Sequence, residues 1–157
     1  MSSPFVGNCG SNRFKTRGAS SKCRTIHASE GGEWDYDRRL KSAAEALIRY
    51  GWLKAILEGH ARVAEGLNVG SPVLVLASTR SVFARKWSDD MKRADVVLDV
   101  EQIATRAVRL GPLVTVVRIE DAVHDVLLSP EPVRARAFDE IARWLQAYAE
   151  VAQQNPV

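Results

Sequence analysis

A histidine close to acidic residues is the clearest chemical signal in the sequence. His124 lies in the stretch RIEDAVHDVLLS, residues 118–129, between Asp121 and Asp125 and just after an apolar run. An imidazole exchanges a proton near neutral pH, and a carboxylate that holds its second nitrogen can make it a general base. The same pattern is also found in ordinary surface loops. The residues alone therefore leave both a catalytic and a structural interpretation of His124 open.

Four aspartates upstream are candidates for that carboxylate: Asp89, Asp90, Asp95 and Asp99. The last of them, Asp99, precedes a helical pattern with Gln102 three residues later, which favours a helix N-cap. The first two stand among lysines and arginines and are expected to be solvated. Asp95 precedes the apolar run VVL, which would hold the loop against a sheet. We therefore predict that Asp95 is the acid and His124 the base.

Two apolar runs predict the strands that carry these loops. SPVLVLAS (residues 71–78) and VTVVRI (residues 114–119) are typical of strands buried on both faces of a parallel sheet. We expect the strands Pro72–Ala77 and Val114–Ile119 to be adjacent and parallel, joined by a right-handed crossover helix. Ligands bind beyond the carboxyl ends of such strands, where both candidate loops begin. The fold class expected is α/β.

Helical spacing of apolar residues predicts the flanking helices. Residues 100–110 have this spacing and are followed by Gly111, an expected helix terminator, and a last stripe runs over residues 133–148. Residues 38–57 predict two short helices, or one helix bent at Gly51. Among the tryptophans, core packing is expected for two: Trp52 and Trp144.

Residues 1–32 have neither period and are rich in serine, glycine and asparagine, so we expect an irregular arm before a domain over residues 33–157. Of the 22 lysines and arginines, five lie in the first 29 residues, which contain no acidic residue. The rest of the chain contains the other 17 together with all 19 acidic residues. The arm has only Phe14 for stacking and no nucleic-acid motif, so nucleic acid is not an expected partner. Cys9 and Cys23 lack the spacing of a zinc site or a disulfide framework, and we expect no metal and no cofactor.

No window has the pattern of a signal peptide or the length of a membrane span, which favours a cytoplasmic protein. The stretch GEWDYD, residues 32–37, is compatible with a pocket lining or with a solvated loop.

Four segments carry a resemblance to a known family. PVLVLAS, ADVVLDVEQIA, LGPLVTVVRIEDAVHDVLLS and AFDEIARWL, in that order, resemble the C-terminal part of an α/β-hydrolase of the serine-aminopeptidase and monoacylglycerol-lipase-like type. The resemblance covers roughly residues 26–148. It implies an incomplete α/β-hydrolase fold and a serine hydrolase of esters, lysophospholipids or similar acyl substrates, with Asp95 and His124 as acid and base of a Ser/Asp/His triad. The family usually places its acid directly after the strand, where this sequence has Ser81.

The nucleophile of that family is missing from the sequence. The 157 residues contain no G-x-S-x-G, the motif of the tight turn that exposes the serine. In GNCGS, residues 7–11, Cys9 has the position of the nucleophile, but no helical pattern follows. We expect a chain that lacks the nucleophile half and is inactive alone. The alternative is a non-catalytic remnant or interaction module with the same partial fold. An unpartnered sheet edge would also favour self-association.

Overall fold

A computed structural model describes residues 26–37, 50–84 and 86–154 of the protein. The elements follow one another along the chain as η1 (Ala28–Glu30), α2 (Tyr50–Glu65), β1 (Val73–Ser78), η2 (Asp89–Arg93), α3 (Val100–Ala107), β2 (Val114–Ile119), η3 (Val126–Leu128) and α4 (Glu131–Gln154). Each η element is a short 3-10 helix.

The strands β1 and β2 are adjacent and parallel, as the apolar runs predicted. Their register runs from Val73 opposite Val114 to Ser78 opposite Ile119, and in the described residues the sheet has these two strands. The helix α3 lies between them in sequence, so this is the predicted strand, helix, strand unit. The structure is therefore of the α/β class, in a small form.

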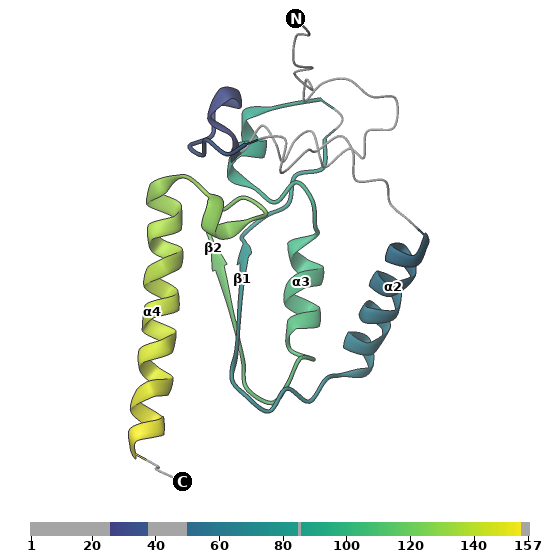
Figure 1. The fold of residues 1–157 in the computed structure, drawn as a ribbon, viewed down its shortest axis with the longest axis vertical. Coiled ribbons are helices and arrows are strands. Elements are labelled where there is room, and N and C mark those ends of the chain that lie inside the picture. Colours follow the sequence, from purple (N-terminus) through teal and green to yellow (C-terminus); the bar gives the residue numbers. More distant parts are fainter. Residues whose placement is uncertain (1–25, 38–49, 85, 155–157) are drawn as a thin grey trace, which may run out of the picture.

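The helices α3 and α4 cover opposite faces of the sheet (Figure 1). From α4, Trp144 Nε1 donates a hydrogen bond to Thr115 Oγ1 of β2 at 3.1 Å. From α3, Glu101 forms a two-pronged ion pair with Arg118 of the same strand. Side chains alternate between the faces of a strand, and Thr115 and Arg118 are an odd number of positions apart. The result is a three-layer arrangement in which both strand ends carry their loops to one side.

The main cluster of buried apolar residues lies between the sheet and α4. Ile119 at the end of β2 packs with Ala122 and Val126 of the following loop and with Val133 and Ala137 of α4. The first turns of α4 are therefore anchored beside the loop that carries His124, and this packing positions that loop relative to the sheet.

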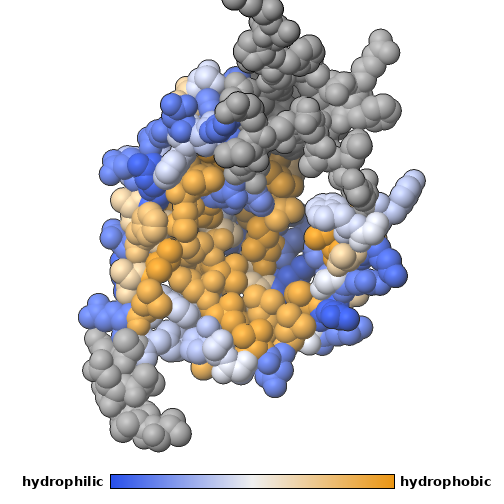
Figure 2. Space-filling model, viewed as in Figure 1, coloured by the Kyte–Doolittle hydropathy of each residue, from blue (hydrophilic) through white to orange (hydrophobic). Residues whose placement is uncertain are grey.

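The helix α2 differs from the prediction. Its apolar stripe was expected to pack, but Trp52 is 56% exposed, so the expected core role of that side chain is wrong. The helix is tied to the rest of the chain near its end, where Arg109 Nη1 donates to Ala64 O at 2.6 Å. Figure 1 shows α2 standing apart from the sheet, and Figure 2 shows a broad apolar surface in the middle of the same view, next to the mostly hydrophilic outer side of α2. Trp144, in contrast, is partly buried against Tyr148.

Gly111 has a different role from the expected one. The helix α3 ends at Ala107, and Gly111 instead passes close to residue Val69, whose amide donates to Leu110 O at 3.0 Å. A Cβ at position 111 would lie 2.7 Å from Val69 O. The glycine is required by this close approach of two backbones.

Several predictions fall on residues outside the described part of the chain. These are the basic arm up to residue 25, both cysteines, GNCGS, and residues 38–49 of the helical pattern predicted over residues 38–57. Residues 26–32, the end of the predicted arm, form η1 and its flanks, in which Ile26 and His27 are buried. None of the helices in the described ranges combines the length and the apolar character needed to cross a membrane.

Candidate active site

The structure brings His124 and Asp95 together. His124 Nδ1 lies 2.9 Å from Asp95 Oδ2, and the two side chains are 22% and 3% exposed, respectively. The contact forms beyond the carboxyl ends of the two strands, on the edge where the α/β pattern places ligand sites. The predicted pair is therefore in hydrogen-bond contact, and its catalytic role stays a prediction.

The insertion that precedes Asp95 folds back onto the end of β1. Ser81 and Asp95 form an isolated parallel bridge, in which Asp95 N donates to Arg80 O at 3.0 Å and Val82 N donates to Asp95 O at 2.8 Å. The described residues between Ser81 and Asp95, 82–84 and 86–94, thus belong to a closed excursion that contains η2. The excursion returns the chain to the strand end, so Asp95 lies beside Ser81 in space.

The carboxylate of Asp95 is held by three hydrogen bonds. The amides of Val97 and Leu98 donate to Oδ1 at 2.7 and 2.8 Å, and the imidazole of His124 lies at Oδ2. Burial on its own raises the pKa of Asp95, but the hydrogen bonds from His124, Leu98 and Val97 outweigh it and hold the pKa below the ordinary value of 3.8. Asp95 is therefore ionised at neutral pH, even though it is buried.

The ionised carboxylate fixes the tautomer of His124. A carboxylate without its proton can only accept hydrogen bonds, so Nδ1 of the imidazole must carry the hydrogen that points at Oδ2. In the neutral ring, Nε2 is then left with a lone pair. Within the described ranges, no group forms a hydrogen bond with Nε2. This is the state in which an imidazole can take a proton from a hydroxyl group.

The loop that carries His124 turns sharply after β2. Asp121 has a φ of 62°, in the left-handed region that aspartate tolerates better than most residues. Val123, next to the histidine, donates its amide to Ser129 Oγ at 3.0 Å, and Ser129 is fully buried. The serine thus closes the loop across its base and restrains the backbone on which His124 sits.

The other aspartates have the structural roles expected of them. Asp99 is the N-cap of α3, accepting from Glu101 N at 2.9 Å, and Gln102 Nε2 also donates to it. The side chains of Asp89 and Asp90 are 84% and 64% exposed and form ion pairs with Lys92 and Arg80. Asp95 is thus the candidate that the fold buries and directs at the imidazole.

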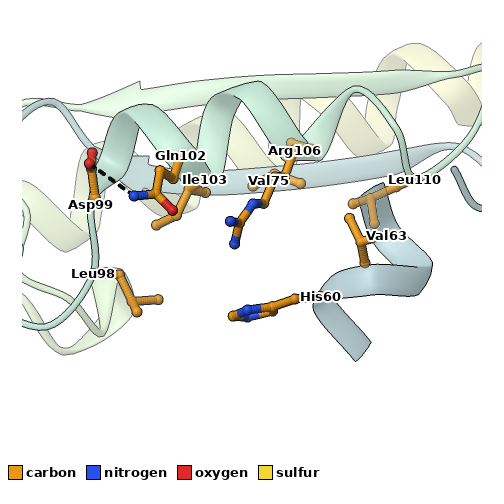
Figure 3. Close-up of a pocket in the computed structure, with 10 residues that line it drawn as sticks. His60, Val63, Val75, Leu98, Asp99, Gln102, Ile103, Arg106 and Leu110 are labelled. Atoms are coloured by element: carbon orange, nitrogen blue, oxygen red, sulfur yellow. Dashed lines mark hydrogen bonds between the residues drawn. The ribbon is translucent and has the colours of Figure 1, made fainter. Parts of the chain in front are cut away.

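A separate cavity lies between α2 and α3. It has a volume of about 290 Å³ and an apolar lining that includes Val63, Val75 and Ile103, while His60 and Arg106 reach into it from the two helices (Figure 3). Neither His124 nor Asp95 lines it. Among the described residues, no three His, Cys, Asp or Glu side chains converge in the way that metal ligands do.

Sequence reasoning missed the residues that support the pair. Ser81 Oγ donates to Leu98 O at 2.8 Å and accepts from Val100 N at 2.9 Å, which links the end of β1 to the start of α3. Ser129, Glu33 and Trp34 also contact the His124 loop or its end. A serine that lies far along the chain from its partner leaves no periodic signal. The acid and aromatic residues of GEWDYD were noticed, but their partners could not be read from the pattern.

Comparison of the chain with protein-family models, with curated proteins and with solved structures gives no match.

Proposed function

We propose that this chain supplies the acid and the base of a Ser/Asp/His triad in a serine hydrolase of the α/β-hydrolase type. The observation that carries the proposal is the buried, ionised Asp95 at 2.9 Å from Nδ1 of His124. The order of elements along the chain and the position of the pair beyond the strand ends are the further support. The substrate class proposed is an ester, a lysophospholipid or a similar acyl compound, because of the family resemblance.

In this mechanism, Asp95 keeps the hydrogen of the neutral imidazole on Nδ1, so that Nε2 can take the proton of a serine hydroxyl as it attacks the acyl carbon. The negative carboxylate then stabilises the imidazolium that has formed. His124 returns the proton from Nε2 to the leaving alcohol as the acyl-enzyme forms. A water molecule, deprotonated in the same way, releases the acid.

The place of the acid agrees with the proposal. In the family that the sequence resembles, the acid usually follows the strand directly, and here Ser81 occupies that position. Because Asp95 bridges to Ser81, the insertion leaves the carboxylate next to the usual place in space. The acid comes later in this sequence than is usual in the family, but the backbone pairing with Ser81 keeps it at the end of β1.

The serine has to come from outside the 157 residues, which contain no G-x-S-x-G. The proposal is tested by mixing the purified chain with a fragment of a hydrolase of this type that carries G-x-S-x-G, followed by fluorophosphonate labelling and turnover of short p-nitrophenyl esters. The chain alone is expected to give neither labelling nor turnover, because it supplies no nucleophile and no oxyanion hole.

In the complemented protein, His124→Ala is expected to abolish turnover and Asp95→Asn to lower kcat by about 10⁴-fold. Asp99→Asn is the matched control, since asparagine is an equally good N-cap and should leave turnover unchanged. Turnover that survives His124→Ala would refute the proposal. A complemented protein that binds its partner fragment but shows no labelled serine would favour the alternative, a non-catalytic module with the same partial fold.

A further inference from the structure

Residues 26–37, here called the docking segment, lie against the beginning of α4 and the loop that carries His124 (Figure 1). The contact joins parts of the chain that are 94 to 101 positions apart. The structural effect of this contact follows from the backbone that it restrains, at Leu128 and at the start of α4.

Two side chains of the docking segment make the contact. Trp34 Nε1 donates a hydrogen bond to Leu128 O at 2.9 Å. Glu33 Oε2 accepts from Glu131 N at 2.9 Å and from Arg134 Nη1 at 2.6 Å. The first satisfies a carbonyl at the end of η3, and the second satisfies an amide at the start of α4, where a negative side chain is also favoured by the helix dipole.

Arg134 joins the two side chains into one cluster. Its guanidinium carbon lies 5.1 Å from the centre of the Trp34 ring, within the range of a cation–π contact. The same Nη1 that meets Glu33 also donates to Ser129 O at 3.2 Å. The cluster therefore forms hydrogen bonds with the backbone at Ser129 and on both sides of it, at Leu128 and Glu131.

From Ser129 the restraint passes directly to the base. Ser129 Oγ accepts the amide hydrogen of Val123, which is bonded in sequence to His124. Three positions within four residues, Leu128, Ser129 and Glu131, are thus bonded to Trp34, Arg134 and Glu33, and the Ser129 hydroxyl closes the loop from within. Rotation of the His124 backbone away from Asp95 would have to break this set of bonds.

The docking segment is itself well defined. His27 and Trp34 form an isolated parallel bridge, and Trp34 N donates to Ile26 O at 3.0 Å. Ile26 is 1% exposed. Gly32 passes so close to the carbonyl of Ile26 that a Cβ would overlap it. The backbone of Trp34 is therefore fixed in position by a closed turn.

We propose that Glu33 and Trp34 are positioning residues for the base: they fix the 128–131 backbone and, through Ser129, keep the His124 imidazole directed at Asp95. The inference rests on the proposed function, because positioning matters only if His124 acts as a base. Preorganisation of this kind is how supporting residues act on a catalytic group that they do not touch.

The test reads the tautomer of His124 in the full chain. Protein labelled with ¹⁵N-histidine is examined by long-range ¹H–¹⁵N NMR, which distinguishes the Nδ1–H from the Nε2–H form. The spectrum contains three histidines, and the signals of His124 are assigned by their loss in His124→Gln. The wild type is expected to show the Nδ1–H form, because Asp95 accepts that hydrogen.

Trp34→Phe keeps an aromatic ring but removes the donor to Leu128, and Glu33→Ala removes the acceptor for α4. In both variants the Nδ1–H form is expected to lose its dominance to the Nε2–H form that free imidazole prefers in water. Glu33→Gln keeps an oxygen that can accept from Glu131 N, and it is expected to restore most of the wild-type signature.

Two controls separate positioning from loss of stability. Asp35→Asn changes an acid in the same segment whose side chain is 93% exposed. Val114→Ala weakens the fold at the start of β2, at the opposite end of the strand from the His124 loop. Both are expected to keep the Nδ1–H form, although the second lowers the melting temperature. If Glu33→Ala does not fold, Trp34→Phe decides.

A wild-type tautomer in both Trp34→Phe and Glu33→Ala would overturn the positioning role while leaving the pair intact. An Nε2–H form in the wild type would overturn the pair, and the positioning role with it. A tautomer that shifts in the variants, together with turnover that survives His124→Ala in the complemented protein, would show that Glu33 and Trp34 orient the imidazole but would refute its role as a base.

Discussion

Ser81 and Asp95 pair as backbone neighbours across an isolated parallel bridge at the end of β1. The residues between them form an excursion that contains η2 and is closed by the bonds from Asp95 N to Arg80 O and from Val82 N to Asp95 O. An insertion can therefore lengthen this loop without moving the carboxylate. Ser81 then performs a second task, since its hydroxyl caps the start of α3 through Val100 N.

The lowered pKa of Asp95 predicts a specific pH dependence of stability. The folded pKa lies below 3.8, so the carboxylate contributes stability that is fully present above that pH and is lost as the pH falls through the folded pKa. We expect Asp95→Asn to lower the free energy of unfolding at pH 7 by roughly 2 kcal/mol, as for other broken buried hydrogen bonds. Urea unfolding of both proteins between pH 3 and 7 measures this. A difference between them that does not shrink toward pH 3 would contradict it.

Ser129→Ala should weaken the fold from inside the His124 loop. The serine is completely buried, and its removal leaves the amide of Val123 without an acceptor. We expect a loss of about 1–3 kcal/mol in the free energy of unfolding. Ser88→Ala is a suitable control, because Ser88 precedes η2 without a side-chain capping bond. Equal stability of the two variants would show that the bond within the loop contributes nothing.

Gly32→Ala should loosen the docking segment. The new Cβ would overlap the carbonyl of Ile26, so the turn would have to open. We expect faster amide hydrogen exchange over residues 26–37 and at Glu131, with little change in β2. Gly59→Ala, in α2, has open space around the new methyl group and serves as the control. Unchanged exchange at Glu131 in Gly32→Ala would separate the turn from the start of α4.

The exposed apolar side of the molecule predicts self-association. Leu53 and Leu57 of α2 are 42% and 58% exposed, and β1 pairs with β2 alone among the described residues. Light scattering after gel filtration is expected to give a mass above the monomer's 17.3 kDa that rises with concentration. Leu57→Glu should lower it, whereas Ala55→Glu, which adds the same charge outside the apolar stripe, should not. A constant monomer mass for the wild type would refute this expectation.

The strands and the pair could be predicted because their signals are local or follow from topology. Unbroken apolar runs identify β1 and β2, the capping pattern identifies Asp99, and the parallel arrangement brings the loops of Asp95 and His124 to one edge. These steps needed no knowledge of individual long-range contacts. The apolar residues that follow Asp95 predict a loop held against the sheet, and in the structure Asp95 is 2% exposed.

The remaining features could not be predicted because they depend on which surfaces meet. An amphipathic pattern over α2 indicates a helix with an apolar side, but it does not say whether another element covers that side. The exposure of Trp52 could therefore not be predicted from the pattern. Likewise, the composition of GEWDYD fits a pocket or a solvated loop. Its observed role, bonding of Glu33 and Trp34 to the start of α4 and to Leu128, depends on a contact across most of the chain.

The reach of these contacts has a consequence for how the chain folds. The bond between His124 and Asp95 spans 29 positions, whereas the bond between Glu33 and Arg134 spans 101. The entropy lost on closing a loop increases with its length, and non-local contacts tend to form late. On a nascent or refolding chain, the sheet and the two site residues can thus assemble first, and the His124 loop would gain its final rigidity only when the docking segment arrives.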